Sequence, residues 1–165
     1  MEDPAESPYL SNPTRLGDVI AAIQAMGTYK FYKLSFEGWA DRITGDGSQG
    51  DYWKRIFQEH PEFFRLDSAR AKASLVWRRQ YAKHYDVDSE TRISPQEYKV
   101  LLPERKKRVS RDPLSPADIK TLIDTAINLH SRAVELQRDR GWWKSPLLTA
   151  VAALIGAVAG ALIKH

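Results

Sequence analysis

The sequence predicts an α+β protein: a small head of three helices and a short β wing, a long α-helical stalk, and one C-terminal transmembrane helix. Three patterns lead to this prediction. Apolar residues recur at helical spacing from Leu16 onward, apolar and polar residues alternate around Leu75, and residues 145–163 carry no charged side chain. Spacing separates helices from strands because side chains repeat about every 3.6 residues in a helix and every second residue in a strand.

Changes in composition and charge divide the chain into five expected segments. They are a flexible tail at 1–13, the head at 14–81, a polar linker with a basic run at 82–114, the stalk at 115–141, and a membrane anchor at 142–165.

The uncharged stretch 145–163 is the most apolar part of the chain. At about 1.5 Å of rise per residue, a helix over it is about 28 Å long, close to the apolar thickness of a bilayer. Trp142, Trp143 and Lys144 precede it, as expected at a membrane interface. The alternative is a buried core helix, which is usually shorter and carries polar residues. We therefore expect a single-pass protein embedded in a lipid bilayer.

One face of this expected span carries small residues, including Ala152, Gly156 and Gly160. Small residues let two helix backbones approach closely, so this face predicts self-association within the membrane. Basic residues are concentrated on the N-terminal side of the span, and the positive-inside bias then places residues 1–144 in the cytoplasm.

The order of elements expected between residues 14 and 81 is helix, short strand, helix, helix, strand, loop, strand. Ser35 is positioned to cap the second helix, Pro61 ends the third, and the last strand is expected over 71–80. The stretch HPEFFRL, followed by KASLVWRR, resembles the junction between the third helix and the wing of winged helix-turn-helix domains. This resemblance is one of architecture. It implies a winged-helix fold but neither a particular family nor a function.

The stalk is predicted from a strong helix start at Ser115-Pro116 and an apolar seam with heptad spacing. The seam residues are Ile119, Leu122, Ala126, Leu129, Ala133 and Leu136. Such a seam favours self-association as a coiled coil. The alternative is that the helix packs its seam onto the head, since Ile123, Ile127 and Val134 widen the apolar stripe.

Residues 85–98 resemble an EF-hand calcium loop, with acidic residues at the ligand positions. The candidate ligands are Asp86, Asp88, Glu90 and Glu97. Thr91 occupies the position where such loops require glycine, which weakens the resemblance. The competing interpretation is a polar linker in which Ser94 and Glu97 form a capping box at the start of a short helix.

Composition argues against an enzyme or a bound cofactor. The chain has no cysteine, which excludes thiolate nucleophiles, disulfides and cysteine-ligated metals. The four histidines are far apart in sequence, and we interpret all of them as surface or packing residues. No glycine-rich phosphate loop follows a predicted strand. We therefore expect a non-enzymatic protein without cofactors.

Nucleic acid is one possible partner, because the third helix of a winged helix can enter a major groove while the wing contacts phosphates. The candidate contacts are Lys54, Arg55, Arg70, Lys72 and Arg78. A solvated basic surface is the competing interpretation, because the formal net charge is only +4.

We favour a protein-interaction module, an adaptor or sensor for an unidentified cytosolic protein, oligomerised through stalk and span. A membrane-perturbing or pore-forming effector is a further alternative, although the span has no polar stripe to line a pore.

Overall fold

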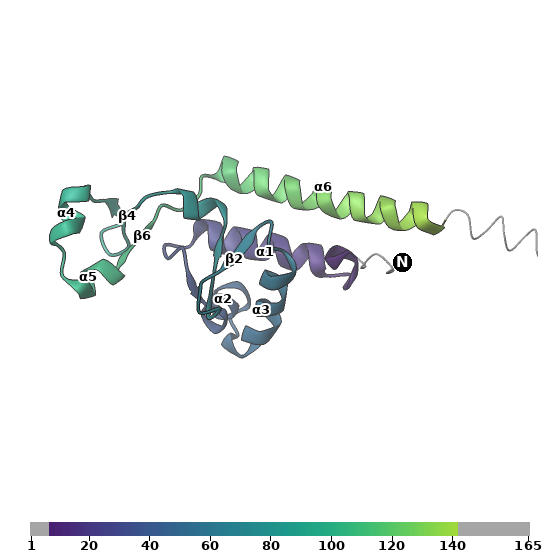
Figure 1. Cartoon of the computed structure of the whole chain (residues 1–165), viewed down its shortest axis with the longest axis horizontal. Helices are drawn as coiled ribbons and strands as arrows, with labels where there is room; N and C mark the ends of the chain where they lie inside the picture. Colours follow the sequence, from purple (N-terminus) through teal and green to yellow (C-terminus); the bar gives the residue numbers. More distant parts are fainter. Residues whose placement is uncertain (1–6, 142–165) are drawn as a thin grey trace, which may run out of the picture.

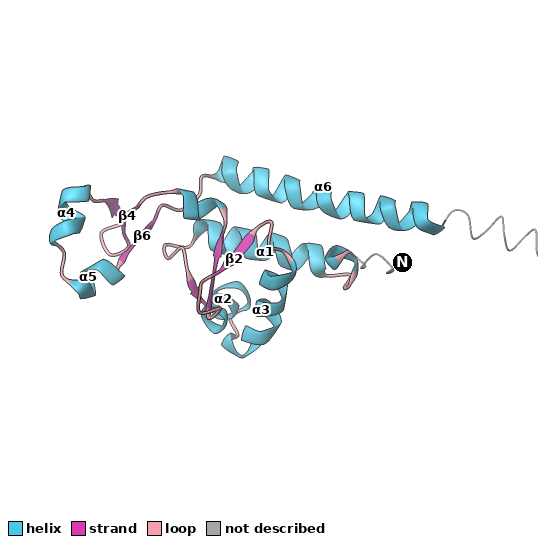
Figure 2. Cartoon of the chain, viewed as in Figure 1, coloured by secondary structure: helices cyan, strands magenta, loops and turns pink. Residues whose placement is uncertain are grey.

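The first helix, α1 (Arg15–Thr28), forms where apolar residues recur every three or four positions, and its residues Val19, Ile23 and Met26 are fully buried. The computed structural model describes residues 7–141 as an α+β fold (Figure 1). Helices make up most of the ordered elements, and the strands are short (Figure 2). The elements of the head after α1 are β1 (Leu34–Ser35), α2 (Phe36–Thr44), α3 (Gly50–Glu59), β2 (Phe64–Leu66) and β3 (Lys72–Leu75). This is the order of elements that the sequence predicts.

Local signals set the ends of these helices. The hydroxyl of Ser35 accepts a hydrogen bond from the backbone N–H of Gly38 at 3.1 Å, which caps α2 as predicted. Gly45 ends α2 in the left-handed region, with φ 75°, where glycine has no steric penalty. Short 3₁₀ turns η1 (Pro8–Leu10) and η2 (Gly47–Gln49) precede α1 and α3.

The three strands of the head form an antiparallel sheet in the order β1-β3-β2. Phe64 lies opposite Leu75 and Leu66 opposite Ala73, so alternation puts these apolar side chains on the face towards the helices. Arg65 lies opposite Ser74 and therefore faces the other way. The expected strand over 71–80 is too long: it ends at Leu75, and a 3₁₀ turn, η3 (Trp77–Gln80), follows.

Large aromatic side chains from α2, α3 and the sheet fill the core of the head. Trp39, Trp53, Phe57 and Phe64 are at most 2 % exposed. The indole N–H of Trp39 donates to the carbonyl of Ala73 at 2.9 Å, so this buried polar group is satisfied within the core and ties α2 to β3.

The segment 82–114, expected to be a polar linker, folds instead into a second lobe. Its elements are β4 (Lys83–Asp86), β5 (Thr91–Arg92), α4 (Pro95–Val100), α5 (Pro103–Lys107) and β6 (Val109–Arg111), with strand order β5-β4-β6. The lobe projects from one end of the head (Figure 1). The predicted capping box at the start of α4 is present, with Ser94 and Glu97 bonded reciprocally.

The last helix, α6 (Pro116–Gly141), packs along α1, so the prediction of a separate long stalk is wrong (Figure 1). Ala126 and Ala133 of the predicted seam are buried in the core of the head, and Ile119, Leu122 and Leu129 pack against it. Leu136 remains 60 % exposed. A Cβ atom placed on Gly27 of α1 would lie 3.0 Å from Cγ1 of Ile119, which shows how closely α6 approaches α1. The seam therefore serves docking onto the head.

No helix within residues 7–141 combines the length and apolar character needed to cross a membrane. This finding contradicts the predicted fold with a C-terminal transmembrane helix, and with it the single-pass, cytoplasm-facing localisation. The expected span, with its packing residues Ala152, Gly156 and Gly160 and its interface residues Trp142, Trp143 and Lys144, lies outside the described residues.

Arg78 in η3 joins the head to the second lobe. Its side chain is fully buried, and its guanidinium donates to four backbone carbonyls. The acceptors are the oxygens of Met26 at 2.7 Å, Tyr29 at 2.6 Å, Arg111 at 2.6 Å and Asp112 at 3.0 Å. Burial lowers the pKa of Arg78 to about 10, so the group stays positively charged at neutral pH. One cation therefore fixes the end of α1 and the chain after β6.

Replacing Arg78 tests this role. Arg78→Met keeps an apolar side chain of similar length but leaves four carbonyl oxygens without their donor. Because hydrogen bonds to charged groups contribute about 1.5–3 kcal/mol each, we expect the free energy of unfolding to fall by at least about 3 kcal/mol in urea denaturation. Arg79→Met is the matched control: Arg79 is exposed, so its loss should change stability by less than about 0.5 kcal/mol. Equal effects at the two positions would contradict the assignment.

The docking of α6 is tested by placing a charge at Ala126. The position is fully buried, so Ala126→Glu should lower the free energy of unfolding by about 3 kcal/mol or more. Ile127 is 42 % exposed, and Ile127→Glu should leave stability nearly unchanged. Thermal denaturation followed by circular dichroism measures both. If α6 instead associated only with a second copy of the chain, Ala126→Glu would change the oligomeric state and leave the stability of the monomer unchanged.

Candidate functional site

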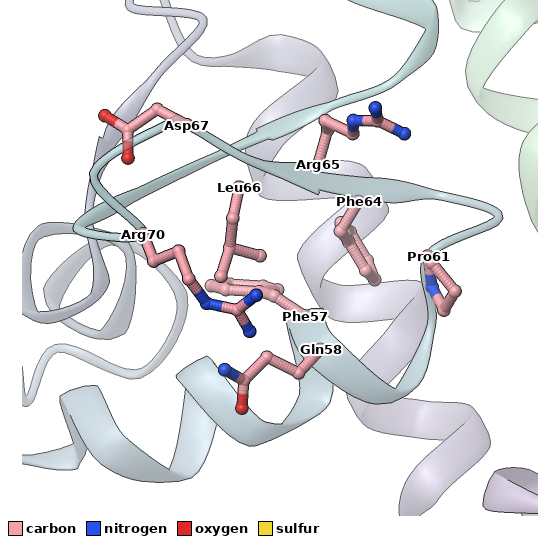
Figure 3. Close-up of a pocket in the computed structure, with 8 residues that line it drawn as sticks. All are labelled: Phe57, Gln58, Pro61, Phe64, Arg65, Leu66, Asp67 and Arg70. Atoms are coloured by element: carbon pink, nitrogen blue, oxygen red, sulfur yellow. The ribbon is translucent and has the colours of Figure 1, made fainter.

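A groove runs between α3 and the β2–β3 hairpin of the head (Figure 3). Its volume is about 260 Å³, and its lining comes from two segments that a short connection brings together. The lining residues are Phe57, Gln58, Pro61, Phe64, Arg65, Leu66, Asp67 and Arg70. The side chains of Phe57, Leu66 and Arg70 point into the space between helix and hairpin, whereas Arg65 points away from α3 (Figure 3).

The floor of the groove is apolar and rigid. Phe57 and Phe64 belong to the core of the head, and their ring centres lie 5.1 Å apart. Leu66 adds a half-buried apolar surface beside them. A floor made by core residues does not have to reorganise to accept a ligand, which lowers the entropic cost of binding.

The hairpin turn that carries Arg70 is held by Asp67. Its carboxylate accepts the backbone N–H groups of Ala71 at 3.0 Å and Lys72 at 3.2 Å. The hydrogen bond from Ala71 is the main reason that the pKa of Asp67 lies below its usual range. Arg70 adopts a left-handed backbone with φ 53°, and its own N–H donates to the carbonyl of Asp67 at 2.9 Å. The turn therefore presents an exposed guanidinium at the rim of the groove.

The helix α3, whose Phe57 and Gln58 line the groove, also carries the basic residues Lys54 and Arg55. The ammonium of Lys54 lies 5.5 Å from the centre of the Phe36 ring, which in turn is 6.4 Å from Phe57. Arg55 is exposed and precedes Gln58 by about one helical turn. Among residues 7–141, neither Arg55 nor Arg70 has a carboxylate partner within ion-pair distance. Arg70 in the lining and Arg55 on α3 thus carry positive charges that form no ion pair within the described part of the chain.

The structure divides the predicted nucleic-acid contacts into three groups. Arg70 lines the groove, whereas Lys54 and Arg55 lie on α3 about one turn before its lining residues Phe57 and Gln58. Lys72 lies opposite Ser35 at the start of β3, so alternation places it on the outer face of the sheet. Arg78 is fully buried and bonded to backbone carbonyls, so it is not available to a phosphate. This burial could not be predicted from the sequence, because an arginine next to Arg79 in a basic stretch is typical of the protein surface.

Three of the four candidate calcium ligands are used in other ways, and the fourth, Glu90, is exposed in the turn with a left-handed backbone, φ 56°. The guanidinium of Arg105 bonds Asp86 at 2.7 Å and Asp88 at 2.5 Å, and Arg108 also bonds Asp88. Hydrogen bonding from Arg108 is the main cause that lowers the pKa of Asp88. Glu97 caps α4 through Ser94. In the part of the chain described, no cluster of histidine or acidic residues is arranged to hold a metal ion.

A polar cluster of Tyr9, His60 and Glu62, in which His60 is fully buried and Glu62 is exposed, lies beside α6, and sequence reasoning did not detect it. The carboxylate of Glu62 bonds the hydroxyl of Tyr9 and Nδ1 of His60, both at 3.0 Å. Burial opposes the charge on Glu62, but the hydrogen bonds from His60, its own backbone and Tyr9 outweigh it, so its pKa is lowered. Burial first, and then the charge of Glu62, raise the pKa of Tyr9. Since His60 is fully buried, we interpret this cluster as packing between η1 and the end of α3.

Comparison with known proteins adds no information about the groove. Neither the protein-family models, nor the curated proteins, nor the solved structures contain a match to this chain.

Proposed function

We propose that the chain is a non-enzymatic protein-interaction module whose groove between α3 and the hairpin binds an acidic segment of a partner protein. The occupant that fits has one apolar side chain for the floor, flanked by carboxylates for the rim. The observation that carries the proposal is the combination of a preformed apolar floor at Phe57 and Phe64 with uncompensated cations at Arg55 and Arg70.

Charge and apolar surface act together at such a site. Burying an apolar side chain contributes affinity in proportion to the area removed from water. Cations at the rim add attraction to an acidic partner and discriminate against basic ones. Arginine suits this task because its planar guanidinium can bond both oxygens of a carboxylate.

The order of elements in the head supports its interpretation as a winged helix, with α3 as the third helix and β2–β3 as the wing. Duplex nucleic acid is the second candidate partner, because Arg55 and Gln58 lie one turn apart on α3 and Arg70 stands at the tip of the wing. The acidic Asp51 at the start of α3 and the burial of Arg78 weaken this second candidate. A protein partner accounts for the apolar floor as well as the charge.

Binding of a synthetic peptide tests the proposed function. The probe is a fluorescent twelve-residue peptide of glutamate and serine with one central phenylalanine, titrated by anisotropy against the full chain. We expect measurable binding, with about tenfold weaker binding for Arg70→Glu, since the change removes one charge-assisted bond and adds repulsion. Arg79→Glu is the matched control, because it makes the same charge change away from the groove.

The peptide itself supplies the second control. Replacing its phenylalanine with serine should weaken binding if the floor takes part. Equal binding of the two peptides, or equal loss in Arg70→Glu and Arg79→Glu, would contradict recognition by this groove. A DNA duplex that binds at about 50 mM salt, where phosphate contacts are strong, and that loses affinity in Arg70→Glu would favour the nucleic-acid candidate.

A further inference from the structure

The outer face of the head sheet carries a second hollow, on the other side of the hairpin from the groove. Its volume is about 450 Å³, within the range of about 300–1,000 Å³ that is usual for small-molecule sites. It is lined by residues from the chain before β1, from the hairpin, from η3 and from β6: Tyr32, Lys33, Arg65, Leu66, Asp67, Ser68, Arg79 and Arg111. Four separate segments therefore contribute to one polar site.

Three arginines converge on this hollow from different elements. Arg65 extends from β2 on the face away from α3, as alternation requires and as Figure 3 shows. Arg79 is exposed in η3, and Arg111 stands at the end of β6. Within the described range 7–141, none of the three forms an ion pair with a carboxylate.

Arg111 is held in place but incompletely bonded. Its guanidinium lies over the Tyr32 ring, 4.9 Å from the ring centre, and bonds the carbonyl of Tyr81. Its Nε atom is buried and has no hydrogen-bond partner in the described structure. Tyr32 is fixed in turn, because its backbone N–H donates to the hydroxyl of Ser110 at 3.0 Å. Arg111 therefore contributes a cation whose position at the hollow is fixed by its contacts with Tyr32 and Tyr81.

The one carboxylate in the lining does not cancel these charges. Asp67 accepts two backbone N–H groups in the hairpin turn, and its second oxygen lies 3.7 Å from the ammonium of Lys33. Lys33 thus offsets Asp67, and the positive charge of the three arginines remains. Ser68 adds a hydroxyl at the rim.

We propose that this hollow binds the phosphate group of a small phosphorylated molecule, held by Arg65, Arg79 and Arg111. Arginine forks match the geometry of phosphate oxygens, and several of them around one hollow favour a multiply charged anion over a single carboxylate. The hollow shares Arg65, Leu66 and Asp67 with the groove, but its probe is a phosphate anion and not the acidic peptide, so the two tests have separate readouts.

Inorganic pyrophosphate is the probe, titrated into the full chain by isothermal calorimetry at about 50 mM ionic strength, where surface charge is weakly screened. We expect saturable binding to one site. The double variant Arg65→Gln/Arg79→Gln should bind at least about tenfold more weakly, because two charge-assisted contacts are lost. Arg55→Gln, which removes a charge beside the groove, should stay within about twofold of the original affinity.

Amide chemical shifts on the unmodified protein give a second readout that does not depend on the variants folding. Pyrophosphate should shift resonances of residues 32–33, 65–68, 79 and 111. The proposal is overturned by an absence of saturable heat at millimolar pyrophosphate, by equal weakening in Arg55→Gln, or by shifts confined to other residues. It is also overturned, in favour of a nucleic-acid surface, by a duplex that binds through Arg65 and Arg79 while pyrophosphate does not.

Discussion

The architecture depends on one buried cation. Arg78 is fully enclosed, yet it carries a charge that its four carbonyl acceptors must solvate in place of water. Two of these acceptors, Met26 and Tyr29, belong to the end of α1 and the chain after it, and the other two, Arg111 and Asp112, are the last residue of β6 and the residue that follows it. A buried charge without a partner has a high free-energy cost. The head and the second lobe therefore cannot separate without exposing the guanidinium to water or leaving it buried without acceptors.

Two further features follow from this attachment. It sets the start of α6, because the chain leaves β6 beside α1 and Leu114 donates its N–H to the carbonyl of Gly27 at 2.9 Å. It also positions Arg111 next to the head sheet, where β6 completes the outer hollow. Residues of the hairpin β2–β3 thus contribute to two surfaces that carry arginines: one has an apolar floor and the other is lined mainly by polar side chains. The same pleat that buries Phe64 and Leu66 turns Arg65 to the opposite face.

Features encoded over a few residues could be predicted from the sequence. The caps at Ser35, Ser94 and Ser115 are present, as is the order of helices and strands in the head, because spacing and capping chemistry act locally. The burial of Arg78 could not be predicted, since the strand expected over 71–80 ends before Val76, whose helical backbone begins a 3₁₀ turn in which Arg78 is the buried residue. An apolar seam has the same spacing whether a helix docks on its own head or on a second copy, so the spacing does not show that α6 docks on the head.

The second lobe, which includes ion pairs between residues as far apart as Asp88 and Arg108, has no short sequence signature. The membrane architecture is predicted from the apolar stretch and its flanking residues; no helix of residues 7–141 is long and apolar enough to cross a membrane, and the expected span itself lies outside that range.

The most direct test of the central claim is hydrogen exchange at the Nε–H group of Arg78, observed by NMR in the full chain. This donor bonds the carbonyl of Asp112 at 3.0 Å inside the protein. The structure predicts one arginine Nε–H resonance that exchanges with solvent far more slowly than those of exposed arginines such as Arg79, and that disappears in Arg78→Lys. An Arg78 Nε–H that exchanges as fast as that of Arg79 would contradict the burial of this cation and its role in joining the two lobes.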